Sequence, residues 1–127
     1  MKILVVDDEH LVRWFLERSL RKNGHEVITA HNVEDAAAKL NSENIDILFI
    51  DLRMPGKNGN DLIGKVDVRG KKPKVIVCSA FVTADREEEL RQQGVCIIKK
   101  PFMLDEVNDA VEICKQKNDP FSTANSK

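Results

Sequence analysis

Strand-like and helix-like segments alternate along this sequence, and that alternation limits the fold more than any other feature. Short runs rich in β-branched residues predict five strands, separated by segments with helical periodicity. The predicted strands span residues 3–6, 26–29, 47–50, 75–78 and 95–98. Strands that alternate with helices favour a mostly parallel sheet, covered on both faces through right-handed crossovers. The pattern therefore predicts a three-layer α/β sandwich of the (βα)5 type.

The helical segments each carry their apolar residues on one face. The first is expected to end at Asn23 and Gly24, because glycine tolerates the left-handed position after a helix. Asn32 is the expected N-cap of the second helix. A third helix is predicted around 62–66, and the last one is predicted to begin just after Phe102.

The fourth helical segment, at about 85–93, is expected to be held least firmly. Consecutive glutamates leave Leu90 as its only large apolar anchor. Asp85 and Glu88 have the spacing of a capping pair at its start. A helix with a single apolar anchor is expected to shift at lower cost than its neighbours.

Composition limits the number of domains and the kinds of partner. A chain of 127 residues, 42% of them hydrophobic, is long enough for one domain with a core and too short for two. With 20 basic and 21 acidic residues, the net charge of -1 gives no field that favours nucleic acid or a membrane surface. No apolar run approaches a membrane span and no signal peptide precedes the first strand, so we expect a cytoplasmic protein. Residues 1–117 are expected to form the domain, and 118–127 a polar tail or linker stub.

The cysteines lack the spacing of a metal or redox motif. Cys78, Cys96 and Cys114 are odd in number, form no CxxC pair and lie in apolar stretches. Such cysteines are more often small core residues than metal ligands or disulfide partners. We therefore expect three core residues.

Acidic residues stand where two predicted core strands end. Asp7 and Asp8 follow the first strand, and Asp51 follows the third. The carboxyl ends of parallel strands face one crevice, so we expect three carboxylates to meet there. They resist ionising together unless a cation neutralises them, and Mg²⁺ prefers oxygen ligands of this kind. Since Mg²⁺ usually completes its shell with water and phosphoryl oxygens, the pattern predicts phosphate chemistry with an aspartate nucleophile.

Two further strand ends supply groups that suit a phosphoryl anion. Ser79 offers a hydroxyl after the fourth strand, and Lys100 offers a cation after the fifth. Together they are suited to hold a phosphoryl group on Asp51. Alone, Asp7 and Asp8 would be read as acidic residues at a helix N-terminus. The additional groups make the functional interpretation the stronger one.

This combination resembles the receiver domain of two-component response regulators, in order and spacing, over about the first 117 residues. The matching positions are Asp7-Asp8, the run Asp51-Leu52-Arg53-Met54-Pro55-Gly56 with Gly59, Ser79-Ala80 and Lys100-Pro101-Phe102. The resemblance implies a flavodoxin-like sheet with strand order 2-1-3-4-5. It also implies a phosphorylation-controlled regulator, not an enzyme, with at most slow self-phosphorylation and self-dephosphorylation.

Position by position, the resemblance implies that Asp51 accepts the phosphoryl group. The implied ligands of Mg²⁺, or of Mn²⁺ in its place, are Asp8, Asp51, the main-chain carbonyl of Arg53 and, through water, Asp7. The implied contacts of the phosphoryl oxygens are Ser79, Lys100 and the backbone amide of Ala80.

The implied phosphoryl donor is a histidine kinase or a histidine phosphotransfer protein. The downstream output partner is not specified by the sequence, and dimerisation on phosphorylation stays open; no direct nucleic-acid or membrane partner is expected. Trp14 lies opposite the apolar stripe of the first helix, so it is expected to be at least partly exposed. Scattered apolar exposure is common, and the alternative is that Trp14 and Leu11 form a docking patch for the helices of the donor.

One position departs from the common receiver pattern. Ile97 stands three residues before Lys100, where many receivers carry an aromatic residue that turns inward on activation. We still expect phosphorylation to shift Ser79 and the fourth helix. The resemblance also implies that the residue two positions after Ser79 tunes the rate of self-hydrolysis. Here it is Phe81, a bulky apolar residue, so self-hydrolysis is expected to be slow.

Two other functions fit parts of the pattern. An aspartate-nucleophile phosphohydrolase would also need Mg²⁺, a lysine and a hydroxyl, but such enzymes place a DxD motif at the first strand, and Asp8-Glu9-His10 breaks it. A receiver-like interaction module usually lacks one of the acidic, acceptor or lysine positions. All of them are present in this sequence.

Overall fold

A parallel five-stranded sheet forms the centre of the protein. A computed structural model describes residues 1–52, 63, 73–80 and 82–117. The sheet order is β2-β1-β3-β4-β5, and every neighbouring pair is parallel. The strands are β1 (Lys2–Val6), β2 (Glu26–Ala30), β3 (Ile47–Ile50), β4 (Lys74–Ser79) and β5 (Cys96–Lys99). The predicted strands and their order are confirmed, with limits that differ by one residue at most.

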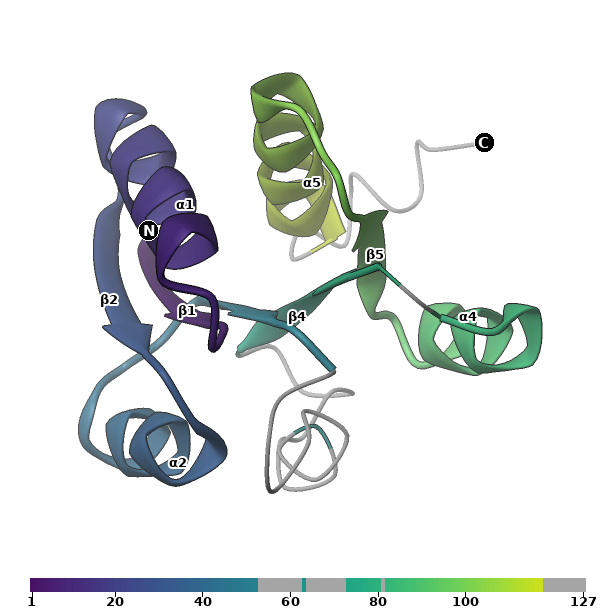
Figure 1. Ribbon diagram of the computed structural model, residues 1–127, viewed down its shortest axis with the longest axis horizontal. Coiled ribbons are helices and arrows are strands. Elements are labelled where there is room, and N and C mark those ends of the chain that lie inside the picture. The colour runs from purple at the N-terminus through teal and green to yellow at the C-terminus, as the bar shows by residue number, and fades with distance from the viewer. Residues whose placement is uncertain (53–62, 64–72, 81, 118–127) are drawn as a thin grey trace.

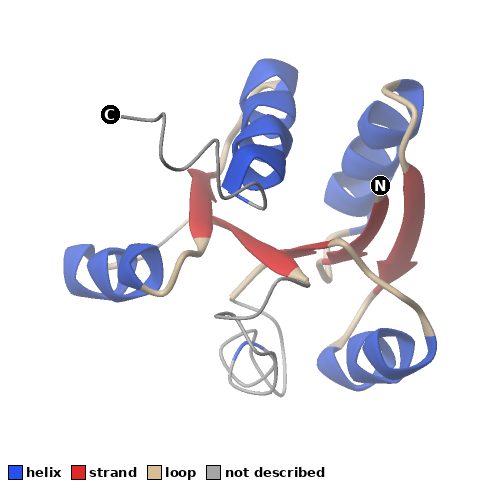
Figure 2. Ribbon diagram, turned by 180° about the vertical axis from the view of Figure 1, so that it is seen from behind, coloured by secondary structure: helices blue, strands red, loops and turns tan. Residues whose placement is uncertain are grey.

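Helices cover both faces of this sheet. Among the described residues they are α1 (His10–Lys22), α2 (Val33–Ser42), α4 (Ala84–Gln92) and α5 (Leu104–Lys117). Figure 1 shows α1 and α5 on one face and α2 and α4 on the other, and Figure 2 shows the same layers from behind. The helix predicted around 62–66 lies outside the described residues except for Ile63, which is buried.

The sheet divides the apolar core into two clusters. Along β3, Leu48 and Ile50 point to the α2 and α4 side, whereas Ile47 and Phe49 point to the α1 and α5 side. Successive side chains of a strand alternate between faces, so a strand covered on both sides must be apolar throughout. Full burial of each of these side chains contributes roughly 1.5–3 kcal/mol.

Local capping explains where the first helices begin and end. Asn23 is the C-cap of α1, and Gly24 follows with φ +88°, a backbone conformation that glycine adopts without strain. The Asn32 side chain accepts a hydrogen bond of 2.7 Å from the Asp35 amide at the start of α2. Both predicted boundaries are confirmed.

The cap of α4 differs from the predicted one. The Thr83 hydroxyl accepts a hydrogen bond of 3.2 Å from the Arg86 amide, so Asp85 lies inside the first turn and does not cap the helix. The prediction of an Asp85 and Glu88 capping pair was wrong, because a threonine two residues earlier supplies the oxygen. Leu90 is fully buried and is the only buried residue of this helix, as predicted.

The cysteines lie in or against the cluster on the α1 and α5 side. Cys78 and Cys114 are buried and Cys96 is half-buried, so the prediction of core residues is confirmed for the first two and partly for the third. None of the helices that the structure describes is both long enough and apolar enough to span a bilayer.

Candidate functional site

Asp7 and Asp51 extend two adjacent strands by one residue each. The Asp7 amide donates to the Ala30 carbonyl at 3.3 Å, and the Asp51 amide donates to the Val6 carbonyl at 3.0 Å. The strand ladder therefore fixes the backbone of both aspartates at the same edge of the sheet. Asp7 is only 1% exposed and Asp51 only 5%.

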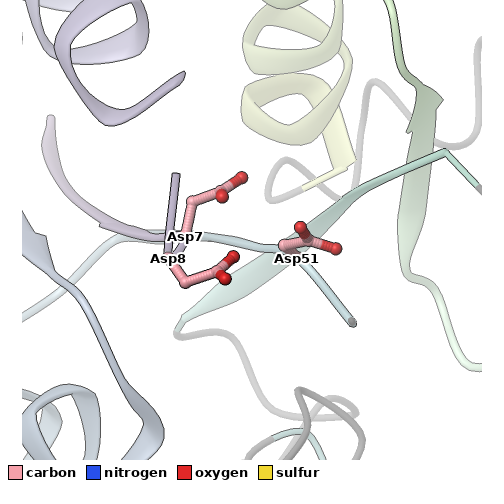
Figure 3. A group of neighbouring side chains, drawn as sticks. All are labelled: Asp7, Asp8 and Asp51. Carbon is pink, nitrogen blue, oxygen red and sulfur yellow. The ribbon is translucent and has the colours of Figure 1, made fainter. Parts of the chain in front are cut away.

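Three carboxylates meet at this edge, as the sequence predicted. Asp7, Asp8 and Asp51 each offer an oxygen, and these oxygens lie within 4.8 Å of one another. Figure 3 shows the three side chains close together beside the strand ends. Asp8 is the exposed member of the group, and its side chain gives the cluster a solvent side.

Lys100, which directly follows the edge strand β5, joins the same cluster. Its Nζ atom donates to Asp7 Oδ2 at 2.8 Å, to Asp51 Oδ2 at 2.9 Å and to Glu9 Oε1 at 3.0 Å. The Lys100 side chain is 13% exposed and its partners Asp7 and Asp51 are buried, so solvent screens these two contacts only weakly. Lys100 thus acts as an internal cation for two buried carboxylates.

The protonation properties of the site follow from this arrangement. Burial raises the pKa of Asp7, and the nearby Asp51 adds to the rise, while hydrogen bonds from Lys100 and the Glu9 amide oppose it. Burial alone would lower the pKa of Lys100, but its hydrogen bonds to Asp7, Asp51 and Glu9 outweigh that effect and raise it. Lys100 is therefore a permanent cation at physiological pH.

Further contacts hold Asp7 in place from the start of α1. The Glu9 amide donates to Asp7 Oδ1 at 2.9 Å, and the Arg13 guanidinium donates to the Asp7 carbonyl. Neither Glu9 nor Arg13 was predicted as a site residue. Glu9 directly follows the acidic pair and Arg13 lies five residues after Asp8. This nearness in sequence was the only signal, and it cannot show which way a side chain points.

Ser79 and Ala80 mark the β4 side of the crevice. Ser79 is the last residue of β4 and is fully buried, and its carbonyl accepts a hydrogen bond of 3.0 Å from the Lys100 amide. Ala80 is exposed and lines a groove together with Lys100. The structure therefore brings the β4 and β5 ends together, whereas Arg53 and Phe81 lie outside the described residues.

The donor set suits a hard divalent cation. Carboxylate oxygens at this spacing are the ligands that Mg²⁺ and Mn²⁺ take in proteins. Asp8 supplies an ionisable group on the open side, where water can complete the coordination shell. The described residues thus fit the predicted metal, with Asp7, Asp8 and Asp51 as the carboxylates available to it.

An apolar groove of about 510 Å³ lies beside the site. Its walls come from α1 and from the segment after β5, and Phe15 and Phe102 meet there with ring centroids 6.1 Å apart. Leu11, at the groove, is 76% exposed, and Trp14, one helical turn further on, is 51% exposed. The predicted exposure of Trp14 is confirmed, and its ring stacks under the Arg18 guanidinium at 5.3 Å.

Comparisons with known proteins agree on one family. The family model described as the response regulator receiver domain matches residues 3–112. Sporulation initiation phosphotransferase F of Bacillus subtilis is 30% identical over 112 residues, which cover 87% of this chain and 90% of that protein. NtrC of Salmonella typhimurium, a DNA-binding transcriptional regulator, is 36% identical over 111 residues, but the chain spans only 24% of its length.

A solved structure extends the similarity to the fold. Response regulator TrrA of Thermotoga maritima, in complex with Mg²⁺ and BeF, is 32% identical and superposes with a TM-score of 0.76, covering 89% of this chain and 97% of the other. The carboxylate cluster at the strand ends is consistent with the phosphoacceptor site of such a domain. This chain therefore belongs to the response regulator receiver domain family of two-component signalling.

Proposed function

We propose that Asp51 accepts a phosphoryl group from a histidine kinase or a histidine phosphotransfer protein, and that this modification switches a partner-binding surface. The observation that carries the proposal is the position of Lys100, whose Nζ lies within hydrogen-bonding distance of both Asp51 and Asp7. A cation held against a buried carboxylate is suited to neutralise charge that arrives on that carboxylate.

In the proposed reaction an Asp51 carboxylate oxygen forms a bond to phosphorus while the bond from phosphorus to the donor imidazole nitrogen breaks. The imidazole leaves with the electron pair. Lys100, with the Ser79 hydroxyl and the Ala80 amide, would then contact phosphoryl oxygens. Asp8, Asp51 and the Arg53 carbonyl would hold Mg²⁺, with Asp7 acting through water, and the ion would supply the charge neutralisation that lets two anions approach. The site contributes positioning and electrostatics.

The groove beside the site is the proposed docking surface for the donor. It is largely apolar and is lined in part by Ala80, Lys100 and the exposed Leu11. The exposed Trp14 lies one helical turn beyond Leu11 on α1. A donor that presents its histidine on a helix would cover these side chains as it brings the imidazole to Asp51. The same proposal locates this exchange in the cytoplasm, and membership of the receiver family supports it.

The proposed output route leads from Ser79 toward α4. Ile97 packs against the cluster that contains Leu90, the one buried anchor of α4. Ser79 precedes the Thr83 cap by four residues. A movement of Ser79 toward a phosphoryl group would therefore bias the position of a weakly held helix, without an aromatic side chain at 97.

The domain arrangement stays part of the proposal. Residues 1–117 would form the receiver domain and 118–127, which lie outside the described residues, a tail or linker. The 90% coverage of the Bacillus phosphotransferase supports a role in a phosphorelay, whereas the NtrC similarity favours a receiver that controls a separate output domain. Dimerisation on phosphorylation is compatible with either of these two roles.

Mass spectrometry tests the central proposal. After incubation with acetyl phosphate and Mg²⁺, the wild type should gain about 80 Da, the mass of one phosphoryl group. Asp51→Asn should gain nothing, and Asp85→Asn, an exposed acid in α4, should behave like the wild type. No adduct on the wild type would refute the proposal. Steady turnover of p-nitrophenyl phosphate would favour the phosphohydrolase instead.

A further inference from the structure

Two cysteines that lie far apart in the sequence meet on the α5 side of the sheet. The Sγ atoms of Cys96 and Cys114 are 3.3 Å apart, although the residues are 18 positions apart in the chain. Helix α5 follows β5 and runs back along it, so a residue late in the helix returns to the start of the strand (Figure 1). The sequence lacks a CxxC motif, and the fold supplies the proximity in its place.

The separation of these sulfur atoms suits covalent linkage. A disulfide bond is about 2.05 Å long, so closing it requires the two atoms to approach by about 1.2 Å. Rotation of two side chains can supply such a movement while strand and helix stay in place. Both residues belong to elements that already pack together.

The two thiols differ in their access to solvent. Cys114 is 1% exposed, whereas Cys96 is half-buried and lines a groove of about 310 Å³ between β5 and α5. A small reagent can therefore reach Cys96 first, and Cys114 stands behind it. An accessible thiol can attack a disulfide reagent, and a second thiol within reach can then displace the reagent from the mixed disulfide.

We propose that Cys96 and Cys114 form a redox modification site that takes a small neutral disulfide as its oxidant. The Cys96 thiolate attacks one sulfur of the reagent R–S–S–R, forms a mixed disulfide and releases RS⁻, which takes up the proton that Cys96 lost. The Cys114 thiolate then attacks Cys96 Sγ and releases the second RS⁻, which takes up the proton from Cys114. The two thiols are oxidised to one disulfide, and the reagent is reduced to two thiols.

The charges around the groove select among small disulfides. Glu106 and Asp109 line it, with Arg91 as its one basic residue among the described lining residues, so its balance is acidic. An anionic reagent is repelled by such a lining. The neutral 2-hydroxyethyl disulfide should therefore react faster with Cys96 than the anionic glutathione disulfide does, and high salt should narrow the difference.

Cys78 provides an internal control. It is buried within β4, and burial raises the pKa of its thiol well above 9.0. A thiol that is both inaccessible and protonated is expected to be inert. The proposal therefore predicts that one of the three thiols stays reduced in the folded protein.

Oxidation of the full chain by 2-hydroxyethyl disulfide tests the assignment. Native protein should lose about 2 Da, the mass of two hydrogens, and denatured thiol titration should fall from three groups to one. Trypsin places the cysteines on separate peptides, 75–86, 92–99 and 100–115, so only the last two should be linked. Retention of all three thiols, or a link through Cys78, would overturn the proposal.

Single variants separate the two steps of the exchange. Cys114→Ala should keep a mixed disulfide on Cys96, because no second thiol is left to displace it. Cys96→Ala should stay unmodified under native conditions, and Cys78→Ala should lose the two hydrogens like the wild type. A Cys96→Ala protein that is modified as fast as the wild type would contradict the order of attack. These readouts do not depend on phosphorylation of Asp51.

Discussion

Lys100 Nζ and Asp51 Oδ2 lie 2.9 Å apart, although 49 positions separate the two residues in the sequence. The lysine is anchored at the end of β5 and the aspartate at the end of β3, with β4 between those strands. Lys100 spans that strand and also reaches Asp7. Lys100 therefore connects the end of β5 with the carboxylates at the ends of β1 and β3.

Lys100→Ala should weaken both phosphorylation and stability. Removing the cation leaves Asp7 and Asp51 buried without this counter-charge, so the free energy of unfolding should fall by about 2 kcal/mol. The initial rate of acceptance from acetyl phosphate should fall by about tenfold or more. Urea unfolding and mass spectrometry measure the two effects.

Lys99→Ala is the matched control for this variant. The Lys99 side chain is 63% exposed, and its Nζ lies 3.3 Å from Glu87 Oε1, away from the carboxylate cluster. An exposed ion pair contributes little, so stability should change by about 0.5 kcal/mol or less. Equal effects of the two substitutions would argue against a special role for Lys100.

Binding of Mg²⁺ should weaken as the pH falls through the raised pKa of Asp7. Because burial raises this pKa, the folded apoprotein keeps the Asp7 proton to a higher pH than the unfolded chain does. The stability contribution of this group is therefore present at low pH and lost as the pH rises through its folded pKa. Mg²⁺ requires the ionised form, so its dissociation constant should rise by about tenfold per pH unit below that point.

Calorimetric titration with Mg²⁺ at several pH values measures this dependence. In Asp7→Asn, the part of the pH dependence of the Mg²⁺ dissociation constant that comes from Asp7 should disappear. Without metal, the free energy of unfolding of Asp7→Asn should lack the pH dependence that comes from this residue. At Mg²⁺ concentrations tenfold above the dissociation constant, the metal should stabilise the wild type by about 1.4 kcal/mol, and chelation should reverse it. A pH dependence that persists unchanged in Asp7→Asn would assign it to another group.

Trp14→Ala should slow phosphoryl transfer from a protein donor and leave transfer from acetyl phosphate unchanged. The exposed Trp14 ring, stacked under Arg18, lies one helical turn beyond Leu11, which lines the groove beside the site. Loss of a buried aromatic contact at an interface costs about 2 kcal/mol, which corresponds to roughly thirtyfold in transfer efficiency. Rapid-quench transfer from a phosphorylated histidine phosphotransfer domain provides the measurement.

Ile113→Ala serves as the control for a general loss of exposed apolar surface. Ile113 is 47% exposed on α5 and lines the other groove, so transfer should stay at the wild-type level. If Trp14→Ala slows transfer from the protein donor and from acetyl phosphate equally, the result would point to a folding defect. If the substitution slows neither transfer, Trp14 is an exposed apolar residue without a role in docking.

Phosphorylation should move α4 more than α2. The anchor of α4 is Leu90 alone, whereas α2 buries Val33 and Ala36 and is capped by Asn32. With Mg²⁺ and beryllofluoride as a phosphoryl mimic, backbone NMR shifts should change at Ser79 and across α4. Unchanged shifts from 85 to 93 would exclude this switch, and shifts across α2 provide the reference.

The sequence predicted most of the fold because its signals are local. Alternation of apolar runs with helical periods marks each strand, and side chains such as Asn32 carry their own cap. It also predicted that Asp7, Asp8, Asp51 and Lys100 lie together, since the carboxyl ends of parallel strands lie at the same edge of a sheet.

Other contacts depend on side-chain direction and on packing, which local signals do not contain. Whether Thr83 or Asp85 caps α4 depends on the residue at which the helix begins. Sequence patterns locate that residue only to within one or two positions. Glu9 reaches Lys100 only because Lys100 arrives from another strand. The Cys96 and Cys114 contact likewise follows from the return path of α5, not from spacing.

The two apolar clusters share no residue among the described parts of the chain. A change of side-chain volume on one side of the sheet is therefore passed to the other side only through the strand backbones, so substitution energies from the two sides should add. Under the proposed function, the α4 side could therefore change to suit a different effector while the α1 and α5 side, which would meet the phosphoryl donor, keeps its packing. In evolutionary terms, input and output specificity can diversify separately within one small domain.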